Sequence, residues 1–157
     1  MRHTLQRTQQ LSCTAETAWR FFSSPVNLAQ ITPPELNFVV LTQLKSHDIY
    51  EGLILDYKVS PLLGIPLRWQ TVIKEVDPGK SFTDFQGKGP YKYWNHHHEF
   101  VPNDNGILMK DTVEYELPLG FLGEILHRLV VRKKLEAIFN YRYSILDRLF
   151  GTKNRTQ

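Results

Sequence analysis

Apolar and polar positions alternate along most of the chain between residues 36 and 117, and this two-residue period is typical of β-strands. The segments that show it fall near 36–43, 51–59, 65–76, 81–87, 91–101 and 107–117, after a weaker one at 3–11. Turn signals at 77–80 (DPGK) and 103–106 (NDNG) separate neighbouring segments. These connections are too short for crossover helices, so we expect an antiparallel meander.

The period changes to that of a helix in two places. After the first strand, Thr14 is a candidate N-cap of one short helix, a second spans about 27–31, and Pro33-Pro34 ends it. From Phe121 to Phe150 apolar residues recur every three or four positions without a proline, which predicts one amphipathic helix of about thirty residues. Its expected apolar stripe comprises Leu122, Ile125, Leu126, Leu129, Leu135, Ile138, Phe139, Ile145, Leu146 and Leu149.

This order of elements predicts an α+β fold, in which a strongly curved antiparallel sheet of about seven strands grips a long C-terminal helix. We expect residues 1–150 to form one domain and 151–157 a disordered tail. The composition fits a globular protein, with 41% apolar and 22% charged residues among 157. One cysteine, Cys13, excludes an intrachain disulfide, and no apolar run reaches the ~20 residues of a transmembrane segment. We therefore expect a soluble, cytoplasmic protein.

Three adjacent histidines stand in the middle of one predicted strand, in the run YWNHHHEF at 93–100. Successive side chains on a strand point to opposite faces. Trp94 and Phe100 mark the inner face, so His96 and His98 should point inward and His97 outward. Tyr91 falls on the outer face in the same alternation.

The next predicted strand carries a carboxylate on its apolar face. Asp111 shares that face with Val113 and Tyr115, whereas charged residues occupy the other face. A tight turn at 103–106 would place Asp111 opposite either His98 or Phe100, depending on the register. In both registers Asp111 lies within reach of His98.

The inner face therefore combines large aromatic side chains with polar ones, and a hairpin at 77–80 would place Asp84 and Gln86 on the same side. Buried polar groups need partners, which either a polar-lined cavity or a small hydrogen-bonded network would supply. We favour the cavity. Its predicted ligand-binding residues are Trp69, Phe82, Trp94, His96, His98, Phe100, Asp111 and Tyr115.

One end of the meander differs from the other in its loops. Residues 60–64, 87–90 and 118–123 are rich in glycine and proline, and two of these loops carry leucines. Apolar residues on loops often mark an interaction site, so this end is a candidate cavity mouth. The alternative is that the leucines cap the core by packing on the long helix.

Several stretches together resemble the START-like, or SRPBCC, superfamily, in its bacterial polyketide cyclase/dehydrase-like branch. They are Pro33-Pro34 with Phe38, GIPLRW at 64–69, FTDFQ at 82–86, GPY at 89–91, WNHHHEF at 94–100, MKDTVEYELPLG at 109–120, and the long helix. The resemblance covers nearly the whole chain. It implies a helix-grip fold with a cavity for apolar ligands, in a branch without a firmly assigned ligand.

We favour a protein that binds a small, largely apolar molecule, such as a lipid, isoprenoid, polyketide or aromatic compound, without catalysis. The alternative is a cyclase or dehydratase that uses His96, His98 and Asp111 as acid and base. No nucleophile elbow, phosphate-binding loop or dinucleotide fingerprint occurs in the chain, so we predict no cofactor.

Two other kinds of partner have weaker support. His96 and His98 with Asp111 as a third ligand would suit a metal, but no further histidine pair or CxxC motif accompanies them, and we predict none. The net charge is +3, and the long helix carries Arg128, Arg132, Lys133, Lys134, Arg142 and Arg148. A solvated helix face is the simplest explanation. RNA, a ribosome or another anionic surface is a second alternative, a protein partner stays open, and no DNA partner is predicted.

Overall fold

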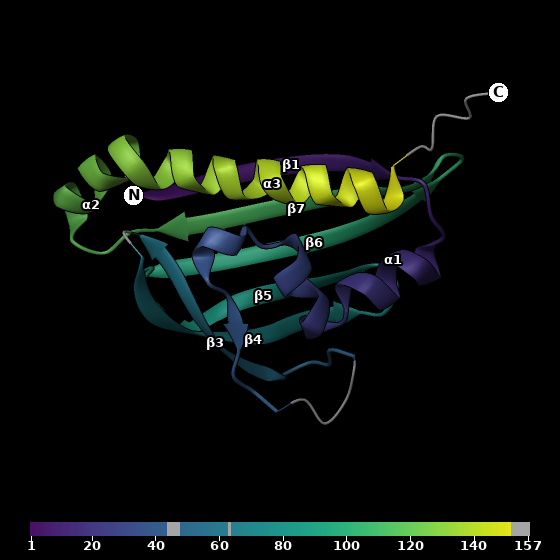
Figure 1. Ribbon diagram of the computed structural model, residues 1–157, viewed down its shortest axis with the longest axis horizontal. Helices are drawn as coiled ribbons and strands as arrows, with labels where there is room; N and C mark the ends of the chain where they lie inside the picture. The colour runs from purple at the N-terminus through teal and green to yellow at the C-terminus, as the bar shows by residue number, and fades with distance from the viewer. Residues whose placement is uncertain (44–47, 63, 152–157) are drawn as a thin grey trace.

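The computed structural model describes residues 1–43, 48–62 and 64–151, which form a curved antiparallel sheet covered on one side by helices (Figure 1). The strands are β1 (Arg2–Leu11), β2 (Val39–Val40), β3 (Ile54–Leu62), β4 (Ile65–Asp77), β5 (Ser81–Lys88), β6 (Tyr93–Asn103) and β7 (Gly106–Glu116). Their order in the sheet is β1-β7-β6-β5-β4-β3-β2. The seven-stranded sheet, the short helical segments after β1 and the long C-terminal helix confirm the predicted α+β helix-grip architecture.

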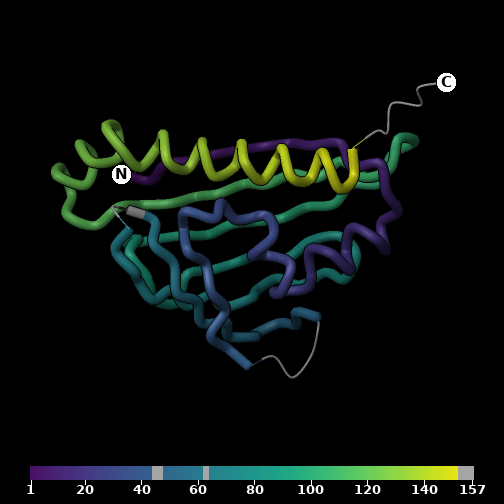
Figure 2. Tube along the Cα trace, in the orientation of Figure 1, coloured from purple at the N-terminus to yellow at the C-terminus, as the bar shows by residue number. Residues whose placement is uncertain are grey.

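The helical segments lie over the concave side of the sheet. They are α1 (Ala15–Phe22), the 3-10 segments η1 (Pro25–Ile31) and η2 (Pro34–Leu36), α2 (Gly120–Leu126), the π-helical η3 (His127–Val131) and α3 (Arg132–Phe150). The trace in Figure 2 shows the N-terminus lying beside the start of the long helix, whose other end lies near the end of β1. A hydrogen bond connects β1 to the long helix near each end. One joins the side chains of His3 and Glu124, and the other runs from Ser12 N, just after β1, to Phe150 O.

The first short helix begins where its cap residue predicts. Thr14 Oγ1 accepts a hydrogen bond from the backbone N–H of Thr17 at 3.2 Å, which satisfies one of the free amides of the first helical turn. The predicted strand at 36–43 is wrong in length, because only Val39–Val40 pairs with β3. A 3-10 turn at Pro34–Leu36, followed by Asn37 with φ of 46°, occupies the preceding positions. The predicted disordered tail at 151–157 lies outside the described residues beyond Gly151.

The long helix is continuous from Gly120 to Phe150, but its apolar stripe is not the predicted one. Leu122, Ile125, Leu126 and Leu129 are exposed, whereas Leu135, Phe139 and Leu146 are buried. Figure 1 shows the reason, since α2 extends beyond the end of the sheet. The π-helical turn η3 also adds a residue to one turn, which shifts the faces of α2 and α3 relative to each other.

The hairpin between β6 and β7 sets the register on which the site depends. Asn103 pairs with Gly106 across the turn, and His98 lies directly opposite Asp111. This confirms the first of the two predicted registers. Gly106 has φ of 117°, and a Cβ at this position would overlap the backbone carbonyl oxygen of Leu11. Only glycine suits this turn, so the residue helps to fix which side chains face each other.

Candidate ligand-binding site

A cavity of about 170 Å³, here called the central cavity, lies between the sheet and α3. Most of the side chains that line it are aliphatic or aromatic, and the polar ones include His96 and Arg142. This mixture is typical of sites that bind small apolar molecules. The lining residues are Leu28, Ile31, Thr32, Leu36, Phe38, Tyr57, Val59, Pro61, Trp69, Thr71, Asp84, Tyr91, Trp94, His96, Leu135, Ile138, Phe139 and Arg142.

Three aromatic side chains form one wall of the central cavity. The ring centroids of Trp69 and Trp94 are 5.2 Å apart, and Tyr91 lies 5.6 Å from Trp69 and 4.8 Å from Trp94. The predicted outward direction of Tyr91 is wrong. Tyr91 lies in a bend before β6 begins at Tyr93, so the alternation of the strand does not extend to it.

A buried chain of histidines and carboxylates lies behind the polar part of the cavity. His96 Nε2 lies 3.0 Å from Asp111 Oδ1, and His98 Nδ1 lies 2.8 Å from the same oxygen. The other nitrogen of His98, Nε2, is 3.0 Å from Asp84 Oδ2. Both side chains point inward as predicted, because β6 alternates regularly through this stretch.

His98 is held as an imidazolium by its two carboxylate neighbours. Burial alone would lower its pKa, but hydrogen bonds to Asp111 and Asp84, together with their charges, raise the pKa above the ordinary value. Arg142 Nη2 also lies 3.4 Å from Nδ1 of His98, where two donors would face each other. The contact of 2.8 Å to Asp111 is shorter and of favourable sign, so it determines the proton position.

His96 is neutral, in contrast to His98, although it lies only two residues away on the same face of β6. Burial lowers its pKa to about 4, and the charge on His98 adds to this effect against the opposing bond to Asp111. A neutral His96 donates from Nε2 to Asp111. Its Nδ1 then has a free lone pair, with no hydrogen-bond partner among the described residues. Because the side chain borders the central cavity, Nδ1 is available to accept a hydrogen bond from a ligand.

Arg142 is the main site residue that the sequence reasoning missed. It is buried, its Nη2 lies 3.6 Å from Asp111 Oδ1, and it borders the central cavity. The prediction that Arg142 lies on a solvated basic face is therefore wrong. Its spacing could have identified it as buried, since Arg142 follows Phe139 by three residues and precedes Leu146 by four on the buried face of α3. Its Nε is buried without a partner in the described structure.

The buried polar cluster balances its own charge. Opposing burial, the positive charge of Arg142 and the hydrogen bonds from both histidines hold the pKa of Asp111 well below its usual range. The pKa of Asp84 is also lowered, because the bond from His98 outweighs burial. Two carboxylates thus face one imidazolium and one guanidinium, with His96 neutral. Pairing of this kind is what buried charges require.

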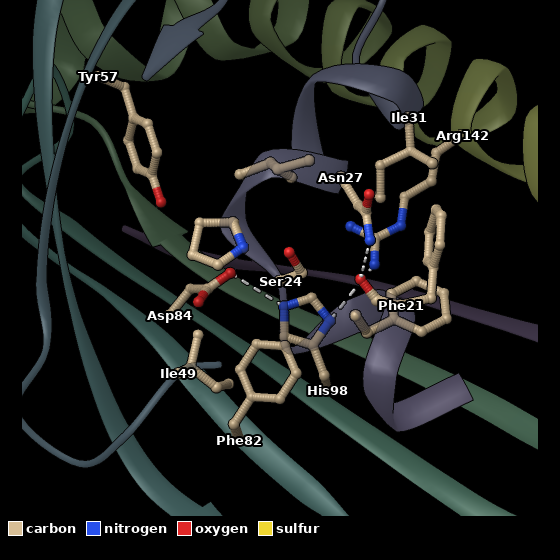
Figure 3. A pocket seen from close by; sticks show the side chains of 13 residues that line it. Phe21, Ser24, Asn27, Ile31, Ile49, Tyr57, Phe82, Asp84, His98 and Arg142 are labelled. Carbon is tan, nitrogen blue, oxygen red and sulfur yellow. Dashed lines mark hydrogen bonds and ion pairs between the residues drawn. The ribbon is translucent and has the colours of Figure 1, made fainter. Parts of the chain in front are cut away.

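A smaller cavity of about 30 Å³ lies on the other side of this cluster, toward α1 and η1 (Figure 3). Figure 3 shows His98 bonded to Asp84, with Arg142 on the other side of its ring. The ring of Phe82 stacks on His98 at a centroid distance of 4.4 Å. Phe82 and His98 therefore border this smaller cavity and are not among the residues that line the central one.

The other predicted site residues lie at different depths. Trp69, Trp94 and His96 line the central cavity, and Asp111 lies behind His96. Phe100 is packed in the core, where its ring meets Trp19, Phe22 and Phe82. Tyr115 is buried behind Tyr91 and Trp94, and its hydroxyl group lies 2.9 Å from His127 Nε2. The structure thus brings the polar residues together but lets only some of the aromatic ones reach the cavity.

A second cavity of about 170 Å³, here called the end cavity, adjoins the central one. Both are lined by Pro61, Tyr91, Leu135 and Ile138. The end cavity is also bordered by Pro90, Pro118 and Leu119, so all three loops of the predicted mouth contribute to it. Leu119 is exposed and does not cap the core.

Two groups of side chains among the described residues could each offer three ligands to a metal. One is Asp84, His96 and His98, and the other is His3, Glu124 and His127. In the first group His98 Nε2 donates to Asp84 and His96 Nε2 donates to Asp111. A metal bound through these nitrogens would have to displace both protons, which is unfavourable for an imidazolium with a raised pKa.

The fold has many structural counterparts, although no family model and no curated protein matches the sequence. Protein CV1439 from Chromobacterium violaceum superposes with a TM-score of 0.69 at 16% identity, covering 96% of this chain and 99% of that one. A START superfamily protein from Mycobacterium smegmatis gives 0.68 at 17% identity, covering 94% and 99%. The Zhui aromatase/cyclase from Streptomyces sp. R1128 gives 0.68 at 14% identity, covering 94% and 95%.

The chain has the START-like fold. The superposition confirms what the resemblance of the sequence implied for the architecture, over nearly the full length of each protein. Identities of 14–17% carry the START-like fold but not the site chemistry, so the ligand has to be argued from this chain's own residues. No helix among the described residues is long and apolar enough to span a bilayer.

Proposed function

We propose that the protein binds a small, largely apolar molecule in the central cavity, with a hydrogen-bond donor of the ligand directed at His96 Nδ1. The observation that carries this proposal is an apolar cavity bordered by one neutral imidazole whose accepting nitrogen has no other partner among the described residues. A hydroxyl or phenol group fits this acceptor.

The shape of the lining supports a flat or elongated apolar body. Trp69, Tyr91 and Trp94 offer ring faces and edges on one side, and Leu135, Ile138 and Phe139 of α3 lie on the other. Burying such a body between them releases water from both, which is the main source of affinity in sites of this kind. The adjoining end cavity would accommodate a longer apolar tail.

A cyclase-type enzyme is the second candidate. Asp111 orients His96 through Nε2, which is how a catalytic base is commonly held, and one protein with the same fold is an aromatase/cyclase. However, a general base works best when its pKa is near the working pH, whereas that of His96 is about 4. We therefore rank binding above catalysis.

The first test is native mass spectrometry of protein purified under mild conditions, followed by denaturation and identification of any released molecule. We expect an organic molecule at one copy per chain, with lower occupancy in His96→Gln. Gln Nε2 can still donate to Asp111, and Gln Oε1 does not occupy the position of the ring Nδ1, so this variant preserves the buried bond while displacing the acceptor. A stoichiometric metal that disappears in the same variant would overturn the proposal.

A probe titration covers the case in which the protein is purified empty. N-phenyl-1-naphthylamine, a neutral dye, should bind with a fluorescence increase that Ile138→Trp abolishes, because Ile138 borders both cavities. The Phe121→Ser variant is the control for dye bound at the exposed apolar surface. Dye binding that is unaffected by Ile138→Trp would contradict a cavity site.

The released molecule then decides between the two candidates. Incubation of the empty protein with that molecule should return it unchanged if the protein is a binder. Loss of water or ring closure, seen as a change in product mass or absorbance, would favour the cyclase-type enzyme. Such turnover should fall in His96→Gln.

A further inference from the structure

The most conspicuous surface feature lies outside the two cavities, where the long helix begins. Six apolar side chains are exposed there, and we call them the apolar tip: Leu119, Phe121, Leu122, Ile125, Leu126 and Leu129. Phe121 is 79% exposed, Leu119 74%, Leu129 68% and Leu122 66%. Clustered exposure of this kind marks a surface that another apolar phase covers. In Figure 1 this segment projects beyond the sheet at one end of the molecule.

The charges next to the apolar tip are mostly positive. Arg128, Arg132, Lys133 and Lys134 are all exposed. The one acidic residue between positions 119 and 135 is Glu124, whose side chain is 19% exposed and is turned toward His3, with which it bonds at 3.1 Å. Arg128 pairs with Glu124 at 3.6 Å and Arg132 pairs with Glu136 at 3.1 Å. Lys133 and Lys134 have no ion-pair partner among the described residues, so two of the four cations beside the apolar tip lack a neutralising neighbour.

We propose that the apolar tip docks this protein on an anionic phospholipid bilayer. Helices with Phe and Leu on one face and Lys and Arg beside them lie in the membrane interface, where apolar side chains enter the acyl boundary and cations meet the lipid phosphates. Each cation near an anionic leaflet adds an attraction that salt screens. A second copy of this chain is a poorer occupant, because it would bring two sets of cations together.

The end cavity lies directly against this surface. Leu119 and Leu126 of the apolar tip line it together with the buried Gly123, and Lys134 lies at its border. Docking would therefore bring the cavity lining close to the bilayer. The inference itself is independent of the proposed ligand, since it concerns the surface and is tested on vesicles without any ligand added.

The test is co-sedimentation of the purified full-length chain with vesicles. One set contains phosphatidylcholine alone and the other about one third phosphatidylglycerol. We expect binding to the anionic vesicles that is about tenfold or more tighter than to the neutral ones and that weakens as salt is added.

Two pairs of variants separate the apolar and the charged contributions. Phe121→Ser with Leu122→Ser should reduce binding to anionic vesicles about tenfold or more. The control replaces two half-exposed side chains farther along α3, Tyr143→Ser with Leu149→Ser, and should leave this binding unchanged.

The charged contribution is tested in the same way. Lys133→Glu with Lys134→Glu should also reduce binding to the anionic vesicles. Lys58→Glu with Arg148→Glu makes the same change of net charge elsewhere on the surface and should have a much smaller effect.

All four variants replace exposed side chains, and circular dichroism and thermal unfolding should confirm that they fold. Equal binding to neutral and anionic vesicles would overturn the proposal. So would anionic binding that survives Phe121→Ser with Leu122→Ser, because it would then be a general charge effect. A dimer that is seen by sedimentation velocity and that dissociates in Phe121→Ser with Leu122→Ser would also overturn the proposal.

Discussion

His98 and Asp111 are direct cross-strand partners, and Nδ1 of His98 lies 2.8 Å from Oδ1 of Asp111. The same oxygen also accepts from His96 Nε2 at 3.0 Å. One carboxylate therefore fixes a charged ring on one side and a neutral ring on the other. The orientation of the His96 ring at the border of the central cavity therefore rests on its hydrogen bond to this side chain.

Removal of the Asp111 charge should destabilise the protein strongly. In Asp111→Asn the buried imidazolium of His98 loses one of its carboxylates and Arg142 loses its partner, so we expect a loss of about 3–5 kcal/mol in the free energy of unfolding. Urea denaturation at neutral pH measures this loss in the free energy of unfolding. Asp84→Asn should cost less, because Asp84 is 23% exposed and can be solvated. Equal losses in the two variants would contradict the central role of Asp111.

The stability of the protein should increase with pH between about 4 and 6.5. The pKa of His96 is lowered to about 4 in the folded state, so in this range the unfolded chain binds a proton at His96 that the folded chain does not. The contribution of neutral His96 is thus fully present above the unfolded pKa and is lost as the pH falls. The expected slope from this residue is ~1 kcal/mol per pH unit.

Denaturation of His96→Gln over the same pH range tests this assignment. The variant should show a flatter profile than the original chain. Part of the slope should remain, because burial lowers the pKa of His127 as well. A profile that is unchanged by the substitution would show that His96 is protonated in the folded state.

A larger side chain at the junction of the two cavities should abolish ligand binding while preserving the fold. Ile138 borders both cavities, so Ile138→Trp would extend into free space and change the free energy of unfolding by less than about 2 kcal/mol. Ala137→Trp is the matched control, since Ala137 directly precedes Ile138 in α3 and is exposed. Titration of both variants with the neutral dye N-phenyl-1-naphthylamine should separate them, and equal affinities would contradict the site.

The turn at Gly106 should tolerate no side chain. In Gly106→Ala a Cβ would overlap the carbonyl oxygen of Leu11, in addition to the strain of φ at 117°. Gly79→Ala controls for that strain, because Gly79 has φ of 81° but open space around its Cβ position. We expect Gly79→Ala to cost about 1 kcal/mol and Gly106→Ala clearly more, as measured by urea denaturation. Similar costs would show that the hairpin relaxes around the added methyl group.

Alternation along the strands predicted the part of the site that lies on the sheet. It placed His96, His98 and Asp111 inward, since β6 and β7 are regular for eleven residues each. It failed for Tyr91, which precedes β6, and it could not tell which inward aromatic side chains reach a cavity. That distinction depends on the covering elements, because Phe100 is buried by Trp19 and Phe22 of α1.

The contribution of the long helix was harder to predict. The sequence of basic residues groups Arg142 with the surface cations, although its spacing from Phe139 and Leu146 is that of the buried face. The apolar residues of α2 continue the same three- and four-residue spacing, which predicts that they belong to the same apolar stripe as those of α3. Periodicity shows that a helix has an apolar face, but only the length of the sheet and the π-helical turn determine which part of that face is covered.

The charge balance of the buried cluster has a consequence for ligands that carry a carboxylate. With Asp84 and Asp111 matched by His98 and Arg142, the site has no spare positive charge for an anion. An anionic ligand beside His96 would raise the pKa of that ring and bring a proton from solvent with it. Uptake of acids by this protein would therefore be coupled to proton uptake and favoured at lower pH, whereas neutral alcohols and phenols would enter without a change in protonation.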